Sequence, residues 1–495
     1  MFESAEIGHK IDKASYDKEV PALREALLDA QYNLLESAEF SVVILIAGVD
    51  GAGKGDTLNL INEWMDPRHI RTRAVGEPTD EERQRPPMWR FWRVLPPKGK
   101  IGVFSGCWYW DPIMGRVYGK IKNAELDQCM EHNVRFEKML TDENVLVLKF
   151  WLHLSKEKQK ARLKALEKAP ATRWRVTDSD WEHHKLYDKL ARVAERALRQ
   201  TSTAVAPWFI VEGSDARYRG LTVGRMILEA IRKWLALKEG KGRRIHAPPL
   251  LPAIDNLNLL RTLDLSLKLD KRTYERELAK CQGRINMLTR DPRFKQVSMV
   301  LVFEGNDAAG KGGSIRRITR ALDARQYQVV PIAAPTEEER AQPYLWRFWR
   351  QVPPPGAVLI FDRSWYGRVL VERVEGLAAQ AEWMRAYGEI NDFEEQLVRN
   401  NTVVLKFWLA ISKEEQQKRF EERQKTGYKR YKITPEDWRN REKWDAYELA
   451  VCDMVDRTST EIADWTLVEA NDKYYARIKV LKTACDRLES ALARL

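Results

Sequence analysis

One long pattern occurs twice in this chain. The segment VVILIAGVDGAGKGDTL begins at Val42 and the segment MVLVFEGNDAAGKGGSI begins at Met299, so Gly48 and Gly305 lie 257 positions apart. The same offset holds without gaps along both halves, where it aligns Pro78-Thr79 with Pro335-Thr336, Trp89–Arg93 with Trp346–Arg350, Leu148–Leu152 with Leu405–Leu409, and Trp208 with Trp465. Solenoid proteins repeat every roughly 20–50 residues. A period as long as this one therefore indicates a duplicated domain.

The chain length agrees with a duplication. At 495 residues the chain is too long for a single hydrophobic core, which indicates two or more domains. A stretch rich in Gly, Pro and basic residues, LALKEGKGRRIHAPPLLPA, runs from Leu235 to Ala253 and is typical of an exposed linker. We therefore predict an N-terminal domain at 1–239, a linker at 240–255 and a C-terminal domain at 256–495.

Each half alternates helical patterns with short apolar runs. A helical pattern at Val20–Leu35 precedes an apolar run at Ser41–Ala47, and the matching run of the second half lies at Ser298–Phe303. Continuous apolar runs are typical of strands that are buried on both faces of a sheet. Further runs in the second half lie at Ala357–Phe361, Thr402–Leu409 and Trp465–Glu469. The alternation predicts the α/β class, with a parallel sheet flanked by helices in each half.

A glycine-rich turn follows the apolar run in each half. The sequence GNDAAGKG at Gly305–Gly312 fits the G-x-x-x-x-G-K pattern, and Gly48–Gly55 is the first copy. In such a P-loop, backbone N–H groups converge on phosphate oxygens at a helix N-terminus, and here Lys311 adds a mobile charge. A tight turn without a nucleotide is the alternative. We expect the loop to bind phosphate through Gly305, Ala309, Gly310, Gly312 and Gly313.

Both loops depart from the usual pattern. The residue after the lysine, which is usually a Ser or Thr that binds Mg²⁺, is Gly312 in one copy and Gly55 in the other. Each loop also contains an aspartate, Asp307 or Asp50. A carboxylate among phosphate-binding amides repels phosphate unless it holds a cation or a proton. We therefore predict that Asp307 is a metal ligand or that it orients the acceptor.

A second acidic residue ends an apolar run in the C-terminal half. In VLIFDRSWYGR, Asp362 follows the strand pattern, and Arg363 and Arg368 come shortly after it. P-loop enzymes hold Mg²⁺ against the phosphates with a carboxylate in this place, and arginines make forked contacts with phosphate oxygens. A helix N-cap is the alternative role for Asp362. We predict two Mg²⁺ ligands, Asp307 and Asp362, and five catalytic residues: Asp307, Lys311, Asp362, Arg363 and Arg368.

The N-terminal half lacks this second acidic residue. Ser105 stands at the position of the aspartate, and Gly106 at that of the following arginine. Serine is neutral and a poor ligand for Mg²⁺, and glycine has no guanidinium. Asp50 and Lys54 of the loop are still present. We expect a degenerate site that is catalytically weak or dead, although it could bind phosphate, brace the other domain or hold a polymer.

A basic segment follows the longest apolar run of the C-terminal half. The sequence EEQQKRFEERQKTGYKRYK, from Glu414 to Lys432, predicts a helical lid that closes over the substrates and excludes water. A solvated helical face with acid–base pairs is the alternative. The predicted phosphate-binding residues of this segment are Arg419, Arg423 and Lys425, with Lys429, Arg430 and Lys432 in the same cluster.

The overall charge is strongly positive. The chain has 84 Lys and Arg against 72 Asp and Glu, which gives +12 and a pI near 9.3. This balance favours a polyanionic partner, although a basic solvated surface explains it equally well. The five cysteines lack metal-ligand spacing, the N-terminus has no apolar signal core, and no stretch is apolar for long enough to span a membrane. We expect a cytoplasmic protein without a membrane partner.

Five motifs of the C-terminal half resemble the polyphosphate kinase 2 family. They are GNDAAGKGG at Gly305, PTEEER at Pro335, FDRSWYGR at Phe361, KFWLAISKEEQ at Lys406 and a TST…W pattern at Thr458. The resemblance covers nearly the whole chain, once in each half. It implies a thymidylate-kinase-like P-loop fold with a lid, and reversible phosphoryl transfer between inorganic polyphosphate and a nucleotide with Mg²⁺. The two-domain members that the chain resembles most are polyphosphate:AMP phosphotransferases, so the resemblance implies AMP as the acceptor.

The family pattern transfers unevenly to the two halves. It matches Asp307, Lys311, Asp362, Arg363 and Arg368 in the second half, but in the first half it matches only the loop aspartate and lysine. We predict a kinase that uses polyphosphate and acts at its C-terminal P-loop. The alternatives are a polyphosphate-dependent ADP or GDP kinase, an ATP-dependent nucleotide kinase, and a non-enzymatic basic scaffold for nucleic acid. The last is disfavoured, and homo-oligomer formation stays open.

Overall fold

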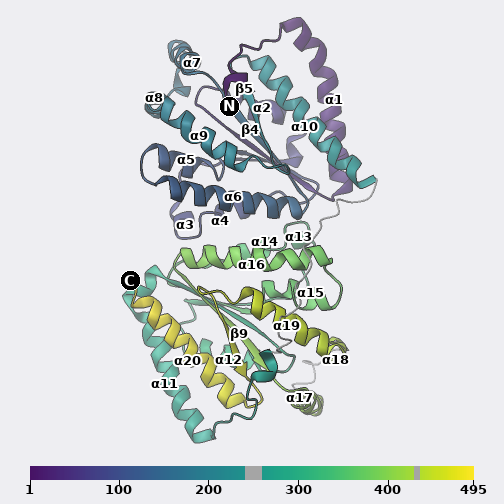
Figure 1. Ribbon diagram of the computed structural model, residues 1–495, viewed down its shortest axis with the longest axis vertical. Coiled ribbons are helices and arrows are strands. Elements are labelled where there is room, and N and C mark those ends of the chain that lie inside the picture. The colour runs from purple at the N-terminus through teal and green to yellow at the C-terminus, as the bar shows by residue number, and fades with distance from the viewer. Residues whose placement is uncertain (240–258, 428–434) are drawn as a thin grey trace. The chain divides into compact units, whose positions relative to one another are not determined.

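The computed structural model describes residues 1–239, 259–427 and 435–495. These residues form two compact units, one built mainly from the N-terminal half of the sequence and the other mainly from the C-terminal half (Figure 1). The predicted linker at 240–255 and the cations Lys429, Arg430 and Lys432 lie outside the described residues. The predicted domain limits therefore stay a prediction.

The α-helices and strands of the two halves come in the same order, whereas the short 3-10 helices differ. Those of the first half are η1 (Glu3–Ala5), α1 (Lys13–Ser37), β1 (Ser41–Gly48), α2 (Lys54–Trp64), η2 (Pro67–His69), β2 (Ile70–Ala74), α3 (Asp80–Arg83), α4 (Trp89–Trp92), β3 (Ile101–Ser105), α5 (Trp110–Val117), α6 (Asn123–Asp142), β4 (Val145–His153), α7 (Lys156–Lys168), η3 (Arg173–Arg175), α8 (Asp178–Lys185), α9 (Tyr187–Thr201), β5 (Trp208–Glu212) and α10 (Ala216–Glu239). Those of the second half are η4 (Leu259–Thr262), α11 (Lys271–Arg290), η5 (Pro292–Gln296), β6 (Ser298–Gly305), α12 (Lys311–Thr319), β7 (Tyr327–Pro331), α13 (Glu337–Arg340), α14 (Trp346–Trp349), β8 (Val358–Asp362), η6 (Trp365–Arg368), α15 (Val371–Val374), α16 (Gln380–Arg399), β9 (Thr402–Ala410), α17 (Lys413–Lys425), α18 (Pro435–Glu442), α19 (Trp444–Thr458), β10 (Trp465–Glu469) and α20 (Lys473–Leu492).

Each unit contains one five-stranded parallel sheet, as the sequence predicts. The strand order is β2-β3-β1-β4-β5 in the first unit and β7-β8-β6-β9-β10 in the second. The central strands β1 and β6 continue directly into the glycine-rich loops. Neighbouring connections diverge at these strands, so a crevice opens at their carboxyl ends, which is where open α/β sheets bind ligands.

The sequence analysis identified no apolar run at the edge strands β2 and β7. Most residues of β2, IRTRA, and of β7, YQVVP, are partly or fully exposed. An edge strand needs no continuous apolar run, because one side and part of its faces remain in contact with water. These strands therefore lack the signal that identified the central ones.

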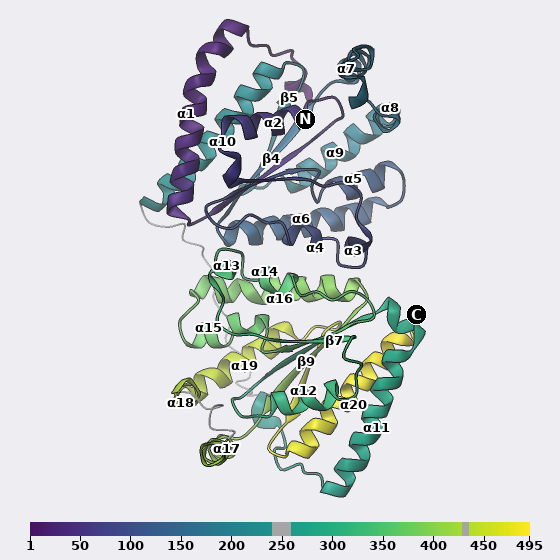
Figure 2. The same cartoon turned by 180° about the vertical axis from the view of Figure 1, so that it is seen from behind.

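Helices cover both faces of each sheet. In the first unit α1 and α10 pack together on one face, and α6 and α9 pack together on the other (Figures 1 and 2). In the second unit α11 and α20 form one layer, and α16 and α19 form the other. No helix within the described ranges is both long enough and apolar enough to cross a membrane.

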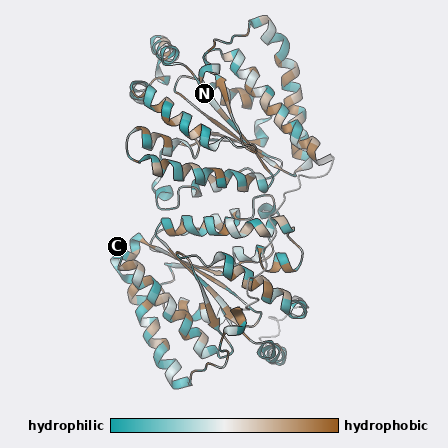
Figure 3. Cartoon of the chain, viewed as in Figure 1, coloured by the Kyte–Doolittle hydropathy of each residue, from teal (hydrophilic) through white to brown (hydrophobic). Residues whose placement is uncertain are grey.

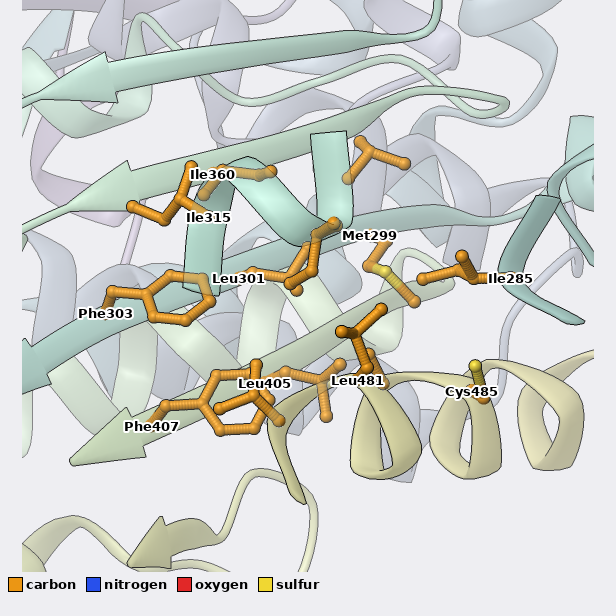
Figure 4. Packing of buried hydrophobic residues seen from close by; sticks show 14 of the residues in the cluster. Ile285, Met299, Leu301, Phe303, Ile315, Ile360, Leu405, Phe407, Leu481 and Cys485 are labelled. Atoms are coloured by element: carbon orange, nitrogen blue, oxygen red, sulfur yellow. The ribbon is translucent and has the colours of Figure 1, made fainter. Parts of the chain in front are cut away.

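The strands of both sheets are coloured mostly as hydrophobic, whereas the helices alternate hydrophobic and hydrophilic residues (Figure 3). In the second unit the core joins Leu301 of β6, Ile360 of β8 and Phe407 of β9 to Leu481 and Cys485 of α20 (Figure 4). All five side chains are fully buried. Burial of such side chains stabilises a fold by about 1.5–3 kcal/mol each. The core therefore holds β6 and β8 rigidly, and with them the residues at their carboxyl ends.

A buried ion pair lies on the opposite face of this sheet. The Lys406 ammonium on β9 donates to Glu394 Oε2 (2.8 Å), to the Tyr366 hydroxyl (3.0 Å) and to the Thr458 carbonyl (2.6 Å). Glu394 in turn accepts from the Tyr366 hydroxyl and from the Trp365 indole. Burial lowers the pKa of Lys406, although Glu394 opposes that shift. The first unit repeats the arrangement with Lys149, Glu137, Tyr109, Trp108 and Thr201.

We expect Lys406→Met to destabilise the second unit strongly, because it leaves the Glu394 carboxylate buried without its cation. Breaking one partner of a buried pair costs about 3–5 kcal/mol of unfolding free energy. Denaturant titration followed by hydrogen exchange of α16 and β9 would measure the loss. The double variant Lys406→Met/Glu394→Leu should recover most of it, and a single variant with wild-type stability would contradict the assignment.

Candidate active site

The glycine-rich loop of the second unit has a backbone that few other sequences could adopt. Gly305 has φ +148°, and a Cβ at this position would lie 2.5 Å from the carbonyl oxygen of Leu409. Gly310 has φ +112° and is the residue immediately before α12. Lys311, the first residue of α12, folds back so that its ammonium donates to the Gly305 carbonyl (2.7 Å). The loop therefore presents the N-terminus of α12 at the carboxyl end of the central strand.

Asp307 is held on three sides. Its Oδ1 accepts from Arg363 Nη2 (3.3 Å) and its Oδ2 accepts from the Asn440 amide (2.9 Å). Its backbone carbonyl accepts from the Gln416 amide (3.1 Å). Asn440 lies on α18 and Gln416 on α17, so two lid helices position the carboxylate. Sequence analysis assigned no role to either residue, although Gln416 ends the quoted motif KFWLAISKEEQ.

Asp362 emerges at the same edge of the sheet. It is the last residue of β8 and lies in register with Phe303, two residues before the loop begins on β6. Asp307 and Asp362 line the same cavity. No cluster of three or more His, Cys, Asp or Glu suited to a metal occurs among the described residues. Two carboxylates suffice for Mg²⁺, because this ion usually keeps waters and takes further oxygens from substrate phosphates.

The cavity beside the loop is large and cationic. Its volume is about 900 Å³. Eight cations line it among the residues that the structure describes, against four carboxylates: Lys311, Arg316, Arg317, Arg363, Arg419, Arg423, Lys473 and Arg477, with Asp307, Asp362, Glu422 and Asp437. Burial and neighbouring arginines lower the pKa of Lys473, and burial lowers the pKa of Arg423. Cations crowded together in this way favour a polyanionic ligand.

Four of these cations were not predicted from the sequence. Arg316 and Arg317 lie on α12, and Lys473 and Arg477 lie at the start of α20. The two helices start at the carboxyl ends of β6 and β10, but nothing in the linear sequence relates them. Their common feature is a position in the first two turns of a helix, which sequence analysis could have searched for basic residues.

Arg419 lies in the cavity wall, but its hydrogen bonds go to the protein. Its guanidinium donates to the carbonyls of Ala308 (3.0 Å) and Ala309 (3.1 Å), and Nε donates to Glu415. Nη2 donates to the carbonyls at 470 and 471 after β10. All five N–H groups are therefore used. In this arrangement Arg419 braces the loop, and its contact with phosphate stays a prediction.

Two further predicted residues lie apart from the loop. Arg368 pairs with Glu372 (2.9 Å), and neither cavity described for this unit includes it. Lys425 is exposed at the end of α17 and is likewise absent from both cavity walls. The predicted Gly312, Gly313 and Ala309 all line the cationic cavity. The structure thus assembles most of the predicted set and leaves Arg368 and Lys425 outside it.

A second, apolar cavity adjoins the first. It measures about 380 Å³ and shares Asp307 and Arg363 with the cationic cavity. Its walls come from η4 and the residues after it, from η6 and α15, from the end of β9 and from α19, and they include Leu260, Leu263, Leu265, Leu370, Val371, Ile411, Trp444 and Val451. Apolar walls with a few polar groups are typical of pockets for small organic ligands.

Comparison with known proteins agrees with this geometry. The family model for polyphosphate kinase 2 matches the chain twice, at residues 10–238 and 268–494. The chain belongs to the polyphosphate kinase 2 family. It is 61% identical over 491 residues to a polyphosphate:AMP phosphotransferase of Pseudomonas aeruginosa, with 99% of both chains covered. It is 56% identical over 494 residues to one of Pseudomonas syringae, with 100% of this chain and 99% of the relative covered.

A solved structure gives the same result. The crystal structure of a protein from Pseudomonas aeruginosa assigned to polyphosphate kinase 2 superimposes on the chain with a TM-score of 0.91. The two sequences are 57% identical and cover each other fully. The tandem pair of polyphosphate kinase 2 domains that the sequence predicted is thereby confirmed.

The loop of the N-terminal polyphosphate kinase 2 domain has different partners. Asp50 pairs with Lys54 (2.9 Å) and with the His183 imidazole (2.6 Å). Burial by itself raises the pKa of Asp50, but Lys54 and His183 outweigh burial and hold this pKa well below its usual range. Lys54 also lies over the Trp110 ring, 5.2 Å from its centre. The lysine and aspartate of this loop thus neutralise each other.

An additional carboxylate lies at this loop. Asp56, at the position of Gly313, pairs with Arg175 (3.0 Å), and Arg162 and Arg219 lie 3.9 and 3.8 Å away. In the C-terminal domain the corresponding space faces the cationic cavity. The Asp56 carboxylate therefore pairs with arginines that could otherwise bind an anionic ligand. This difference is visible in the repeat alignment, where Asp56 stands opposite Gly313.

The arginine that holds the loop comes from a different helix in the N-terminal domain. Arg219 on α10 donates to the carbonyls of Ala52 (3.3 Å) and Gly213 (2.9 Å), which match two of the carbonyls that bind Arg419. Its own counterpart in the second repeat is Ala476. Gly106 has φ +74°, and a Cβ there would lie 2.3 Å from the Val75 carbonyl oxygen. An arginine there would force the Val75 backbone to shift, although Arg363 occupies the matching position of the second repeat with φ +64°.

We expect Arg419→Lys to loosen the loop, because an ammonium has three donors and cannot reproduce five hydrogen bonds. Hydrogen bonds to charged groups contribute about 1.5–3 kcal/mol each. Amide exchange at 306–312 should therefore accelerate roughly tenfold or more, which hydrogen-exchange mass spectrometry would measure. Arg423→Lys, in the same helix and the same cavity wall, is the control; equal effects of both variants would contradict the bracing role.

Proposed function

We propose that the C-terminal domain transfers a phosphoryl group from inorganic polyphosphate to AMP and so forms ADP. The observation that supports this best is the meeting of a large cationic cavity and an apolar cavity at Asp307 and Arg363. The full-length relatives at 61% and 56% identity are polyphosphate:AMP phosphotransferases. The two cavities fit a polyanionic donor and an acceptor with an apolar base.

The cationic cavity is the donor site. A polyphosphate chain has a negative charge on every unit and no apolar part, so it needs many cations and no hydrophobic walls. Arg316 and Arg317 on α12, with Lys473 and Arg477 on α20, extend the positive surface beyond the loop. The chain's net charge of +12 agrees with attraction of a long polyanion to this groove.

The apolar cavity is the acceptor site. Its leucines and aromatic side chains suit a nucleobase, and its shared wall with the donor site places the acceptor phosphate at Asp307 and Arg363. This arrangement brings the attacking oxygen towards the terminal phosphate held at the loop. Holding two reactants in line removes much of the entropic barrier of the transfer.

The remaining barrier is electrostatic. Lys311, Arg363 and the loop amides neutralise charge on the transferred group, and Arg423 of the lid lines the same space. Asp307 and Asp362 would hold Mg²⁺, which would supply positive charge to the phosphates there. Gln416 and Asn440 keep Asp307 in place from the lid helices, so lid position and metal ligation are coupled.

The N-terminal domain does not transfer phosphate in this proposal. It has Ser105 and Gly106 in place of the metal ligand and the arginine, and its loop lysine is paired with Asp50. Asp56 already neutralises the arginines at the loop. Its stable sheet and core leave it a structural role beside the catalytic domain.

The decisive experiment measures ADP formation from AMP with Mg²⁺, using either polyphosphate or ATP as donor. Asp362→Ala should lower kcat about 100-fold or more, because a charged group at the transferred phosphate is lost. Ser105→Ala, at the matching position of the N-terminal domain, is the control and should stay within about twofold. Activity with ATP alone would reject the donor, and an active Asp362→Ala would reject the site.

A reversal of the N-terminal changes should fail to create a second site. In the Asp362→Ala background, Ser105→Asp/Gly106→Arg should give no ADP above that background. The arginine would force the Val75 backbone to shift, and Asp56 still competes with phosphate. Circular dichroism would verify that the variant folds. Recovery of even one tenth of wild-type activity would show that those two positions alone inactivate the domain.

A further inference from the structure

Two polar side chains lie side by side in the wall of the apolar cavity. Glu304 on β6 and Trp408 on β9 are register partners in the parallel sheet, so their side chains project from the same face. Both line the cavity, and they are 5% and 4% exposed. A carboxyl group this deeply buried is costly unless it has a specific partner.

Glu304 has acceptor capacity beyond its protein contacts. The Ser364 hydroxyl donates to its Oε1 (2.8 Å), and the Ser364 backbone also contributes a hydrogen bond. Burial raises the pKa of Glu304, whereas Lys311, Ser364 and Arg363 lower it. A carboxylate offers about four lone-pair sites. Sites therefore remain for donors from a ligand in the cavity.

The Trp408 indole offers the complementary group. Its Nε1–H is buried and has no hydrogen-bond partner among the described residues. Trp151, at the matching position of the N-terminal domain, is also without a partner there. The carboxylate differs between the domains, since Ala47 and Cys107 replace Glu304 and Ser364. The carboxyl–hydroxyl pair thus occurs in the domain that has the complete site.

The position of Glu304 limits what it can bind. It precedes Gly305 directly, and Lys311 and Arg363 are close enough to influence its charge. The group therefore lies between the phosphate end of the acceptor and the apolar walls that suit the base. A carboxylate repels phosphate, so Glu304 does not bind the phosphate group. Apolar walls recognise the base by its shape and need no carboxylate. Hydroxyl groups of the sugar are the donors that this intermediate position can meet.

We propose that Glu304 accepts hydrogen bonds from the ribose hydroxyls of the acceptor nucleotide and that the Trp408 N–H donates to a ribose oxygen. This inference rests on the proposed function, since it needs a nucleotide in the apolar cavity. It makes the enzyme selective for ribonucleotides over deoxyribonucleotides. A site built to bind a hydroxyl rejects the analogue without it, because the buried carboxylate is then left unpaired.

The test compares AMP with 2′-deoxy-AMP and 3′-deoxy-AMP as acceptors, with polyphosphate as donor. Wild type should prefer AMP by roughly 10–100-fold in kcat/KM over at least one deoxy analogue. Glu304→Ala should lower kcat/KM for AMP by a similar factor and leave that for the deoxy analogue within about threefold. Glu304→Gln, which keeps one acceptor oxygen, should fall between the two.

Two outcomes would overturn the inference. One is a wild type that uses all three acceptors equally, and the other is a Glu304→Ala variant that loses the same factor with each of them. Calorimetric titration of AMP and 2′-deoxy-AMP into the protein, without donor, repeats the comparison independently of catalysis. If AMP and polyphosphate give no ADP, the proposed function fails; if they do and the sugar is not discriminated, only the ribose contact fails.

Discussion

The buried pair of Lys406 and Glu394 links the candidate active site to the rest of the C-terminal domain. Three hydrogen bonds from one ammonium tie β9 to α16, to η6 and to the end of α19. Through Tyr366 and Trp365 the pair fixes the turn that follows β8. That turn contains Arg363 and Ser364, and it begins at Asp362. The position of Asp362, the proposed metal ligand, thus depends on the Lys406–Glu394 pair, which holds the turn that follows it.

Duplication has kept this pair and changed what surrounds it. Lys149 and Glu137 reproduce the arrangement in the N-terminal domain, with the same aromatic and carbonyl partners. A buried charge cannot be removed alone without leaving its partner uncompensated, so single substitutions there are strongly disfavoured. Ser105 and Gly106, where β3 ends and the next turn begins, are partly exposed and lie outside this buried pair. The N-terminal domain could therefore lose Asp and Arg at 105 and 106 and still fold.

The two domains brace their loops with arginines from different helices. Arg419 belongs to the lid helix α17, whereas Arg219 belongs to the C-terminal helix α10. The bracing arginine of the C-terminal domain therefore connects loop geometry to the lid, and Gln416 and Asn440 connect the lid to Asp307. In the N-terminal domain the brace is independent of the lid helix.

The sequence by itself determined the duplication, the fold class, the loop and the location of Asp307 and Asp362 at one edge of the sheet. These features depend on local patterns: apolar runs of central strands, glycines at positions of positive φ, and an exact repeat offset that reveals Ser105 and Gly106. Tertiary structure decided which cations gather around the loop, because Arg316, Lys473 and Arg477 come from helices that only folding brings together. It also showed that Arg419 donates to backbone carbonyls and to Glu415, and that Glu304 lines the apolar cavity. Hydrogen-bond partners and cavities arise between distant segments, and linear spacing contains no measure of either.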